Sequence, residues 1–131
     1  MAYTSTVLSD ADIQFGKALW NELRANPRFP VRGMFWLMEG SWHLFIASEV
    51  VAELGPRDAY RRMAEAVQLV PTDSSSSQLL RINLVSPKNP LYEAFRLLWT
   101  NTPPDHIEGK RLASTQVAGM YIEEAYFYGV R

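Results

Sequence analysis

The sequence predicts an α+β fold in which an antiparallel or mixed sheet of about five strands packs with three helices. Segments with apolar residues at helical spacing alternate with segments rich in aromatic and β-branched residues, in the order helix, strand, strand, helix, strand, helix, strand, strand. The chain has 131 residues, 47% of them hydrophobic, which suffices for one domain with its own core. We therefore expect residues 1–131 to form a single domain with helices mainly on one side of the sheet.

The first helix is expected to begin after Ser9. Asp12 follows Ser9 by three residues, a spacing that resembles a capping box. Apolar residues and one glycine then recur at helical intervals between Ile13 and Leu23. The helix should end at Asn26, because the residue before a proline avoids the helical region.

The next two segments predict a β-hairpin. Val31–Glu39 and residues 42–49 read as strands, and Gly40-Ser41 suits a type II′ turn, which takes glycine at its first central position. This turn would place Met38 opposite His43 and Trp36 opposite Phe45. One face would then carry Gly33, Phe35, Leu37, Leu44 and Ile46, and the other Met34, Trp36, Met38, His43, Phe45 and Ala47.

The remaining elements follow from proline, glycine and aromatic positions. Gly55-Pro56 opens a second helix, and Asn89-Pro90 opens a third, since proline is well tolerated in the first helical turn. Residues 79–86 form a third strand, preceded by a flexible serine-rich loop over residues 72–78.

The end of the chain predicts two more strands, over residues 107–117 and 120–130, on either side of Ala118-Gly119. Aromatic content favours strands here, although residues 122–126 are also compatible with a helix.

Charge and composition restrict the partners. Thirteen basic and fourteen acidic residues leave a net charge of −1, so no nucleic-acid partner is expected, and self-association meets little repulsion. The absence of cysteine excludes disulfides, thiolate metal sites and cysteine nucleophiles. The first residues do not resemble a secretory signal, and no apolar stretch reaches the roughly 20 residues that a membrane span needs. We expect a cytoplasmic protein that does not contact the membrane.

The hairpin leads to the main functional hypothesis. Both of its predicted faces are apolar, so each requires a cover, and a patch of exposed aromatic and methionine side chains usually marks a binding site. We therefore expect a non-enzymatic interaction or accessory module, without cofactor or metal, that binds a second copy of itself or another protein. The predicted interface residues are Met34, Trp36, Met38, His43 and Phe45.

Two other functions stay open at this point. A small metal-dependent hydrolase or nuclease would draw on scattered polar residues, and Glu108-x-Lys110 after Asp105 has the residue types of a nuclease centre, although their spacing is too short. A binder of a small apolar ligand would hold it between sheet and helices. The polar candidates for catalysis are Glu39, His43, Glu49, Asp105 and Glu108.

Two charged clusters suit the surface better than a site. Arg57, Arg61 and Arg62 lie near the start of the second predicted helix, where an anion could bind, but a solvated arginine face is the more common arrangement. His106 with its acidic neighbours offers too few ligands for a metal.

Overall fold

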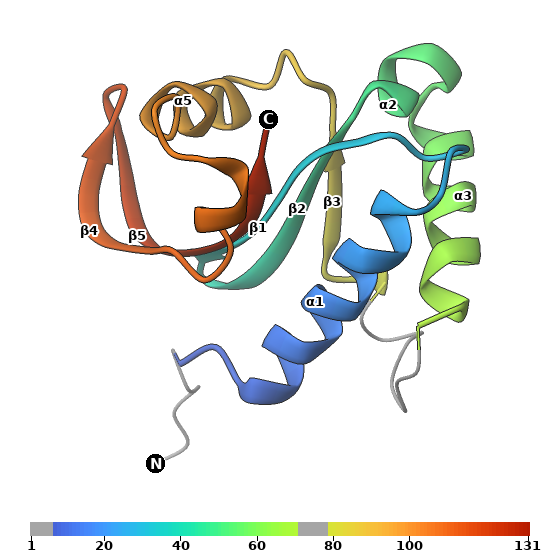
Figure 1. Cartoon of the computed structure of the whole chain (residues 1–131), viewed down its shortest axis with the longest axis horizontal. Coiled ribbons are helices and arrows are strands. Elements are labelled where there is room, and N and C mark those ends of the chain that lie inside the picture. The colour runs from blue at the N-terminus through green and yellow to red at the C-terminus, as the bar shows by residue number, and fades with distance from the viewer. Residues whose placement is uncertain (1–6, 71–78) are drawn as a thin grey trace.

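The computed structural model describes residues 7–70 and 79–131 (Figure 1). A five-stranded sheet has the order β3-β2-β1-β5-β4, in which β2 and β3 run parallel and the other neighbours run antiparallel. The predicted α+β class with a mixed five-stranded sheet is therefore confirmed. The strands are β1 (Val31–Glu39), β2 (Ser41–Ser48), β3 (Ile82–Val85), β4 (Arg111–Val117) and β5 (Met120–Val130), and the helices are α1 (Asp10–Arg24), α2 (Glu49–Leu54), α3 (Pro56–Gln68), α5 (Pro90–Leu98) and the short 3-10 helix η1 (Pro104–His106).

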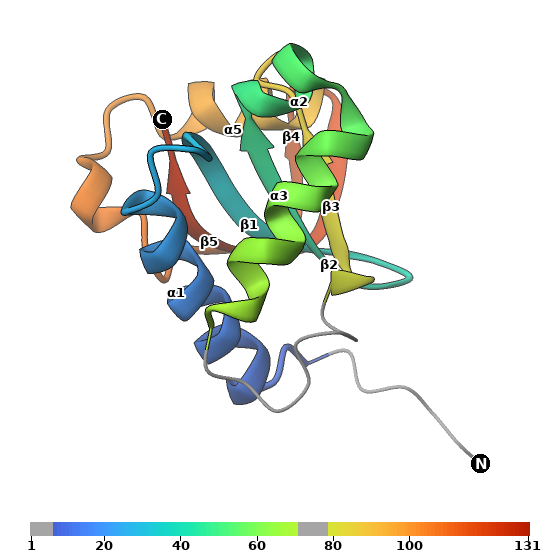
Figure 2. The same ribbon diagram turned by 90° about the vertical axis from the view of Figure 1, so that its right-hand side faces the viewer.

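Helices cover both faces of the sheet (Figures 1 and 2). Helices α1 and α3 lie on one face, where their apolar stripes join a core cluster with Met34, Trp36 and Leu44. Helix α5 lies on the opposite face and forms a second cluster with Phe35 and Phe127. The monomer thus supplies a cover for each face of the hairpin, although α5 is short and covers its face only in part.

The hairpin register differs by one residue from the predicted one. Met38 pairs with Trp42 rather than His43, and only Gly40, at φ 76°, lies between the paired residues Glu39 and Ser41. Because successive strand residues point to opposite faces, this shift moves every β2 side chain to the other side of the sheet. It places Trp42, Leu44 and Ile46 in the core with the methionines, and His43, Phe45 and Ala47 on the face of α5.

Several element boundaries also differ from the prediction. Residue 49 was predicted to end a strand, but it begins α2, a helix that was not predicted. This helix starts here because Ser48 Oγ caps it by accepting a hydrogen bond from Val50 N. Strand β3 begins only at Ile82, and η1 with the turn after it replaces the start of the predicted strand 107–117. Residues 120–130 form a strand, as favoured. The predicted loop 72–78 lies outside the described residues.

The local signals at the other helix starts are confirmed. Ser9 Oγ accepts from Asp12 N at 3.1 Å at the start of α1, and Asn89 Oδ1 accepts from two amides at the start of α5. Side-chain caps of this kind satisfy N–H groups that have no partner within the helix.

Two glycines let α1 lie directly on β5. A Cβ at Gly16 would stand 2.1 Å from the Tyr128 hydroxyl, and a Cβ at Gly129 would stand 2.4 Å from Trp20 Cζ2. Both distances are far below van der Waals contact, so the close approach of helix and strand depends on the missing side chains. This contact fixes the last turn of α1 next to the end of β5.

Candidate functional site

The predicted interface residues do not form one surface. Met34, Trp36 and Met38 are at most 5% exposed and belong to the core beneath α1 and α3. His43 and Phe45 are half-buried on the opposite face, as the corrected register requires. An association surface over the three β1 side chains would require α1 and α3 to leave the sheet. Of the five predicted residues, Met38 and Phe45 line the groove described next.

An open apolar groove of about 440 Å³ lies on the α5 face of the sheet, between the start of α5, the end of β1 and the start of β5. Phe45 lies in this groove, stacked on the buried ring of Phe35 with ring centroids 5.5 Å apart. Tyr121 lies at its edge with 61% of its surface exposed. The groove residues are Leu37, Met38, Glu39, Phe45, Asn89, Pro90, Leu91, Met120, Tyr121, Ile122 and Glu123.

The edge of the apolar groove is acidic. Glu39, at the end of β1, and Glu123, on β5, are both exposed. Neither carboxylate forms an ion pair with any residue in the described part of the chain. The groove thus combines an apolar floor with two negative charges that no cation of residues 7–70 and 79–131 compensates.

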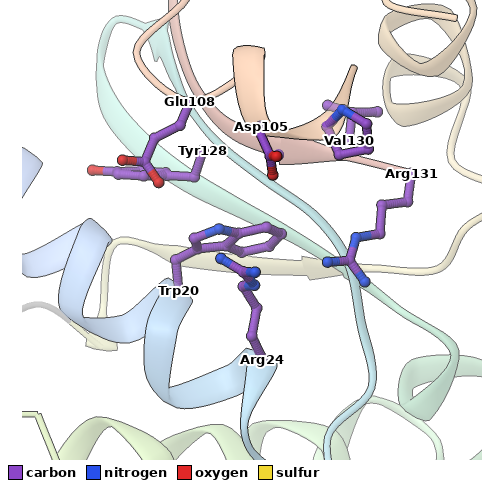
Figure 3. A pocket seen from close by; sticks show the side chains of 9 residues that line it. Trp20, Arg24, Asp105, Glu108, Tyr128, Val130 and Arg131 are labelled. Carbon is purple, nitrogen blue, oxygen red and sulfur yellow. The ribbon is translucent and has the colours of Figure 1, made fainter. Parts of the chain in front are cut away.

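A second, charged pocket of about 230 Å³ lies between the end of α1, η1 and the end of β5 (Figure 3). Arg24 reaches it from the last turn of α1, and its guanidinium carbon lies 5.7 Å from the centre of the Trp20 ring. Asp105 reaches it from η1. The residues of this charged pocket are Trp20, Arg24, Pro104, Asp105, Glu108, Tyr128, Gly129, Val130 and Arg131.

Local contacts hold the acidic side of the charged pocket in place. The buried side chain of Ile107 anchors the turn that carries Asp105, and Gly109 N donates to Phe127 O at 2.8 Å. Lys17 Nζ lies 2.6 Å from Glu108 Oε2. This bond and the negative charge of Glu108 raise the pKa of Lys17. Glu108 is therefore charge-compensated within the monomer.

The polar candidates for catalysis do not converge. Glu39 lies at the apolar groove, Glu49 pairs with Arg32, and only Asp105 and Glu108 share a pocket. Across residues 7–70 and 79–131 no group of three or more His, Asp or Glu side chains is placed to hold a metal ion. The geometry gives the hydrolase or nuclease alternative no assembled centre.

His43 has a contact that resembles a nucleophile–base pair. Its Nε2 lies 3.1 Å from Ser41 Oγ, at the exposed end of the hairpin. A catalytic pair of this kind needs a third group to orient the imidazole and a cavity for substrate. Among the described residues no carboxylate bonds His43, and neither residue lines a pocket described above.

The arginines of α3 are largely engaged within the chain. Arg62 Nη1 donates to Arg28 O at 2.8 Å, and Arg61 lies 3.6 Å from Asp58. Two of the three guanidinium groups in the predicted cluster thus have local partners, which agrees with a solvated face and not with an anion site.

Sequence reasoning missed most residues of both sites. Tyr121 and Glu123 alternate along β5 and stand out as exposed neighbours of buried residues only once the edge of the sheet is known. Trp20 and Arg24 fit an ordinary amphipathic helix, and nothing in the sequence brings them next to Arg131.

Comparison with family models, with curated protein sequences and with solved structures gives no match for this chain. Of the helices in the described part of the chain, none is both long enough and apolar enough to cross a membrane.

Proposed function

We propose that this protein is a non-enzymatic, cytoplasmic interaction module that binds a segment of another protein in the apolar groove. The observation that carries the proposal is that the exposed Tyr121 and the half-buried Phe45 line one open apolar groove, which is large enough for a side chain. Tyrosine, phenylalanine and methionine are enriched at protein interfaces, and a concave apolar site with few polar groups is typical of a binding site.

The charges at the groove favour a particular partner. Glu39 and Glu123 flank an apolar floor and have no cation within the described monomer, so a basic residue next to an apolar anchor would complement both features. We therefore assign the groove to a partner segment in which one large apolar side chain is flanked by lysine or arginine.

The same charges disfavour a symmetric homodimer through this surface. In a two-fold interface the same patch meets itself, so the carboxylates of both copies would share one interface to which the groove lining brings no lysine or arginine. Like charges placed together in an interface cost free energy. Self-association, which the composition permits, is thus the less favoured use of the groove.

The proposal can be tested with synthetic peptides of defined chemistry. An acetylated and amidated peptide with a central phenylalanine between lysines should shift the backbone amide signals of residues 37–39, 89, 91 and 120–123. A peptide with glutamate in place of each lysine should bind at least about tenfold more weakly, because its charges repel those of the groove. Equal affinity for both peptides would contradict the proposed charge complementarity.

Matched variants separate the groove from the rest of the surface. Tyr121→Ala and Glu123→Lys should each weaken binding of the lysine peptide. Leu97→Ala, which removes an exposed apolar side chain from α5, should leave this binding unchanged. Glu53→Lys is the charge control, because Glu53 is exposed and lies outside the groove. A concentration-dependent dimer that Tyr121→Ala disrupts, with no peptide binding, would replace the proposal with self-association.

A further inference from the structure

We infer that the charged pocket binds a small zwitterion, a free aliphatic α-amino acid being the simplest example. Its carboxylate would accept from Arg24 and Arg131, and its ammonium group would donate to Asp105. No residue of this pocket lines the apolar groove, so this inference does not depend on the proposed function.

The two arginines provide the carboxylate half of the site. Figure 3 shows the side chains of Arg24 and Arg131 directed toward the same space. Neither guanidinium forms an ion pair with a residue of the described chain. Guanidinium groups bind carboxylates through paired, charge-assisted hydrogen bonds, so two unpaired guanidinium groups at one pocket favour an anionic ligand group.

The structure fixes the position of both arginines in the chain. Arg24 ends α1, and its guanidinium lies over Trp20, whose ring packs directly on the backbone of Gly129. The backbone N–H of Arg131 donates to Arg32 O at 2.8 Å, and its carbonyl accepts from the Tyr92 hydroxyl. A fixed backbone reduces the conformational entropy lost when a side chain orders around a ligand.

Asp105 determines which anion fits. Its carboxylate is directed into the same space and forms no ion pair within the described residues, whereas Glu108 is already compensated by Lys17. A plain anion would be repelled by Asp105, and a plain cation by the two arginines. A molecule that carries both charges a few bonds apart satisfies all three side chains.

The size and apolar wall of the pocket indicate the rest of the ligand. A volume of about 230 Å³ is below that of sites for drug-sized molecules and suits a molecule of few heavy atoms. Trp20, Pro104 and Val130 line it with apolar surface, which would accommodate a short aliphatic side chain.

Three ligands that differ by one group test the inference on the full chain. L-Leucine carries both charges, 4-methylpentanoate lacks the ammonium group, and isoamylamine lacks the carboxylate. We expect leucine to shift the amide signals of residues 105, 108 and 129–131, and each analogue to bind about tenfold more weakly, the effect of one lost charge-assisted hydrogen bond. Equal binding of 4-methylpentanoate and leucine, or no shift at about 10 mM leucine, would overturn the inference.

Variants provide a test that depends on the sign of the effect. Arg24→Ala should weaken leucine binding about tenfold. Asp105→Asn should also weaken leucine binding, because it removes the partner of the ammonium group. If the site bound only the carboxylate, the same substitution would tighten leucine binding by removing the repulsion from Asp105. Tightening would therefore overturn the inference. Arg57→Ala, which removes an exposed guanidinium outside the pocket, is the control and should leave leucine binding unchanged. All three positions are exposed, so an unchanged amide spectrum outside the pocket verifies that each variant folds.

Discussion

Trp36 and Tyr128 form a hydrogen bond inside the core, with the indole N–H donating to the phenol oxygen at 3.0 Å. The Tyr128 hydroxyl in turn donates to the carbonyl of Ile13 at 2.8 Å. The two bonds connect β1, β5 and α1 through side chains that are almost fully buried. The two bonds satisfy the Trp36 N–H and the Tyr128 hydroxyl, which would otherwise be buried without a partner.

We expect Tyr128→Phe to lower the free energy of unfolding by about 1–3 kcal/mol, because it leaves the buried Trp36 N–H unpaired at little change in volume. Urea titration followed by tryptophan fluorescence measures the change. Tyr121→Phe, which removes an exposed hydroxyl, is the control and should have no effect. An equal stability of both variants would mean that this buried network contributes nothing.

The same tyrosine predicts a loss of stability in alkali. Burial raises the pKa of Tyr128 far above its ordinary value, and the hydrogen bond from Trp36 opposes this only in part. An unfolded tyrosine ionises near pH 10, so above this pH the unfolded state binds fewer protons than the folded state. The free energy of unfolding should therefore be unaffected by Tyr128 below pH 10 and fall as the pH rises further. Tyr128→Phe should make this fall shallower in urea titrations between pH 8 and 11, while an unchanged slope would contradict the assignment.

The sequence predicts the fold better than the sites, for a physical reason. Element type follows from local signals such as the Ser9 cap, the Asn89-Pro90 helix start and the aromatic strand at the end of the chain, and all three are confirmed. The two sites depend on register and on contacts between residues far apart in the chain. A one-residue error at Gly40 was enough to place His43 and Phe45 on the wrong face.

Because Trp20 contacts Gly129 so closely, we expect a methyl group added at position 129 to destabilise the fold. Gly129→Ala should lower the free energy of unfolding by about 1–3 kcal/mol, since the added Cβ would stand 2.4 Å from the indole ring and force α1 or β5 to move. The same substitution in a Trp20→Phe background should cost less, because the smaller ring leaves room for it. Urea titration of the four proteins gives the coupling energy, and an additive cycle would show that the two residues do not meet.

Arg81 is expected to contribute more than the other arginine ion pairs. Its two terminal nitrogens bond both oxygens of Asp12 at 2.7 and 3.0 Å, and its guanidinium lies 4.7 Å from the centre of the Trp36 ring. Arg81→Lys cannot form either the paired bonds or the same stacking, so it should cost about 1–2 kcal/mol of unfolding free energy. Arg96→Lys, at an exposed pair with Glu93, is the control and should be neutral in the same urea titrations. Equal changes in unfolding free energy for the two variants would show that the Arg81–Asp12 pair stabilises the fold no more than an exposed ion pair.

The hairpin register itself can be tested by cross-linking, because the chain has no cysteine of its own. Leu37 and His43 are directly paired and share a face, so Leu37→Cys with His43→Cys should oxidise to an intramolecular disulfide. Met38→Cys with His43→Cys is the matched pair from the predicted register, in which these two residues would be opposite each other. In the observed register their side chains point to opposite faces, which prevents a bond. Mass spectrometry after mild oxidation measures the loss of two hydrogens when the disulfide forms. Preferential cross-linking of the Met38 pair would instead support the predicted register, in which Met38 and His43 lie on the same face.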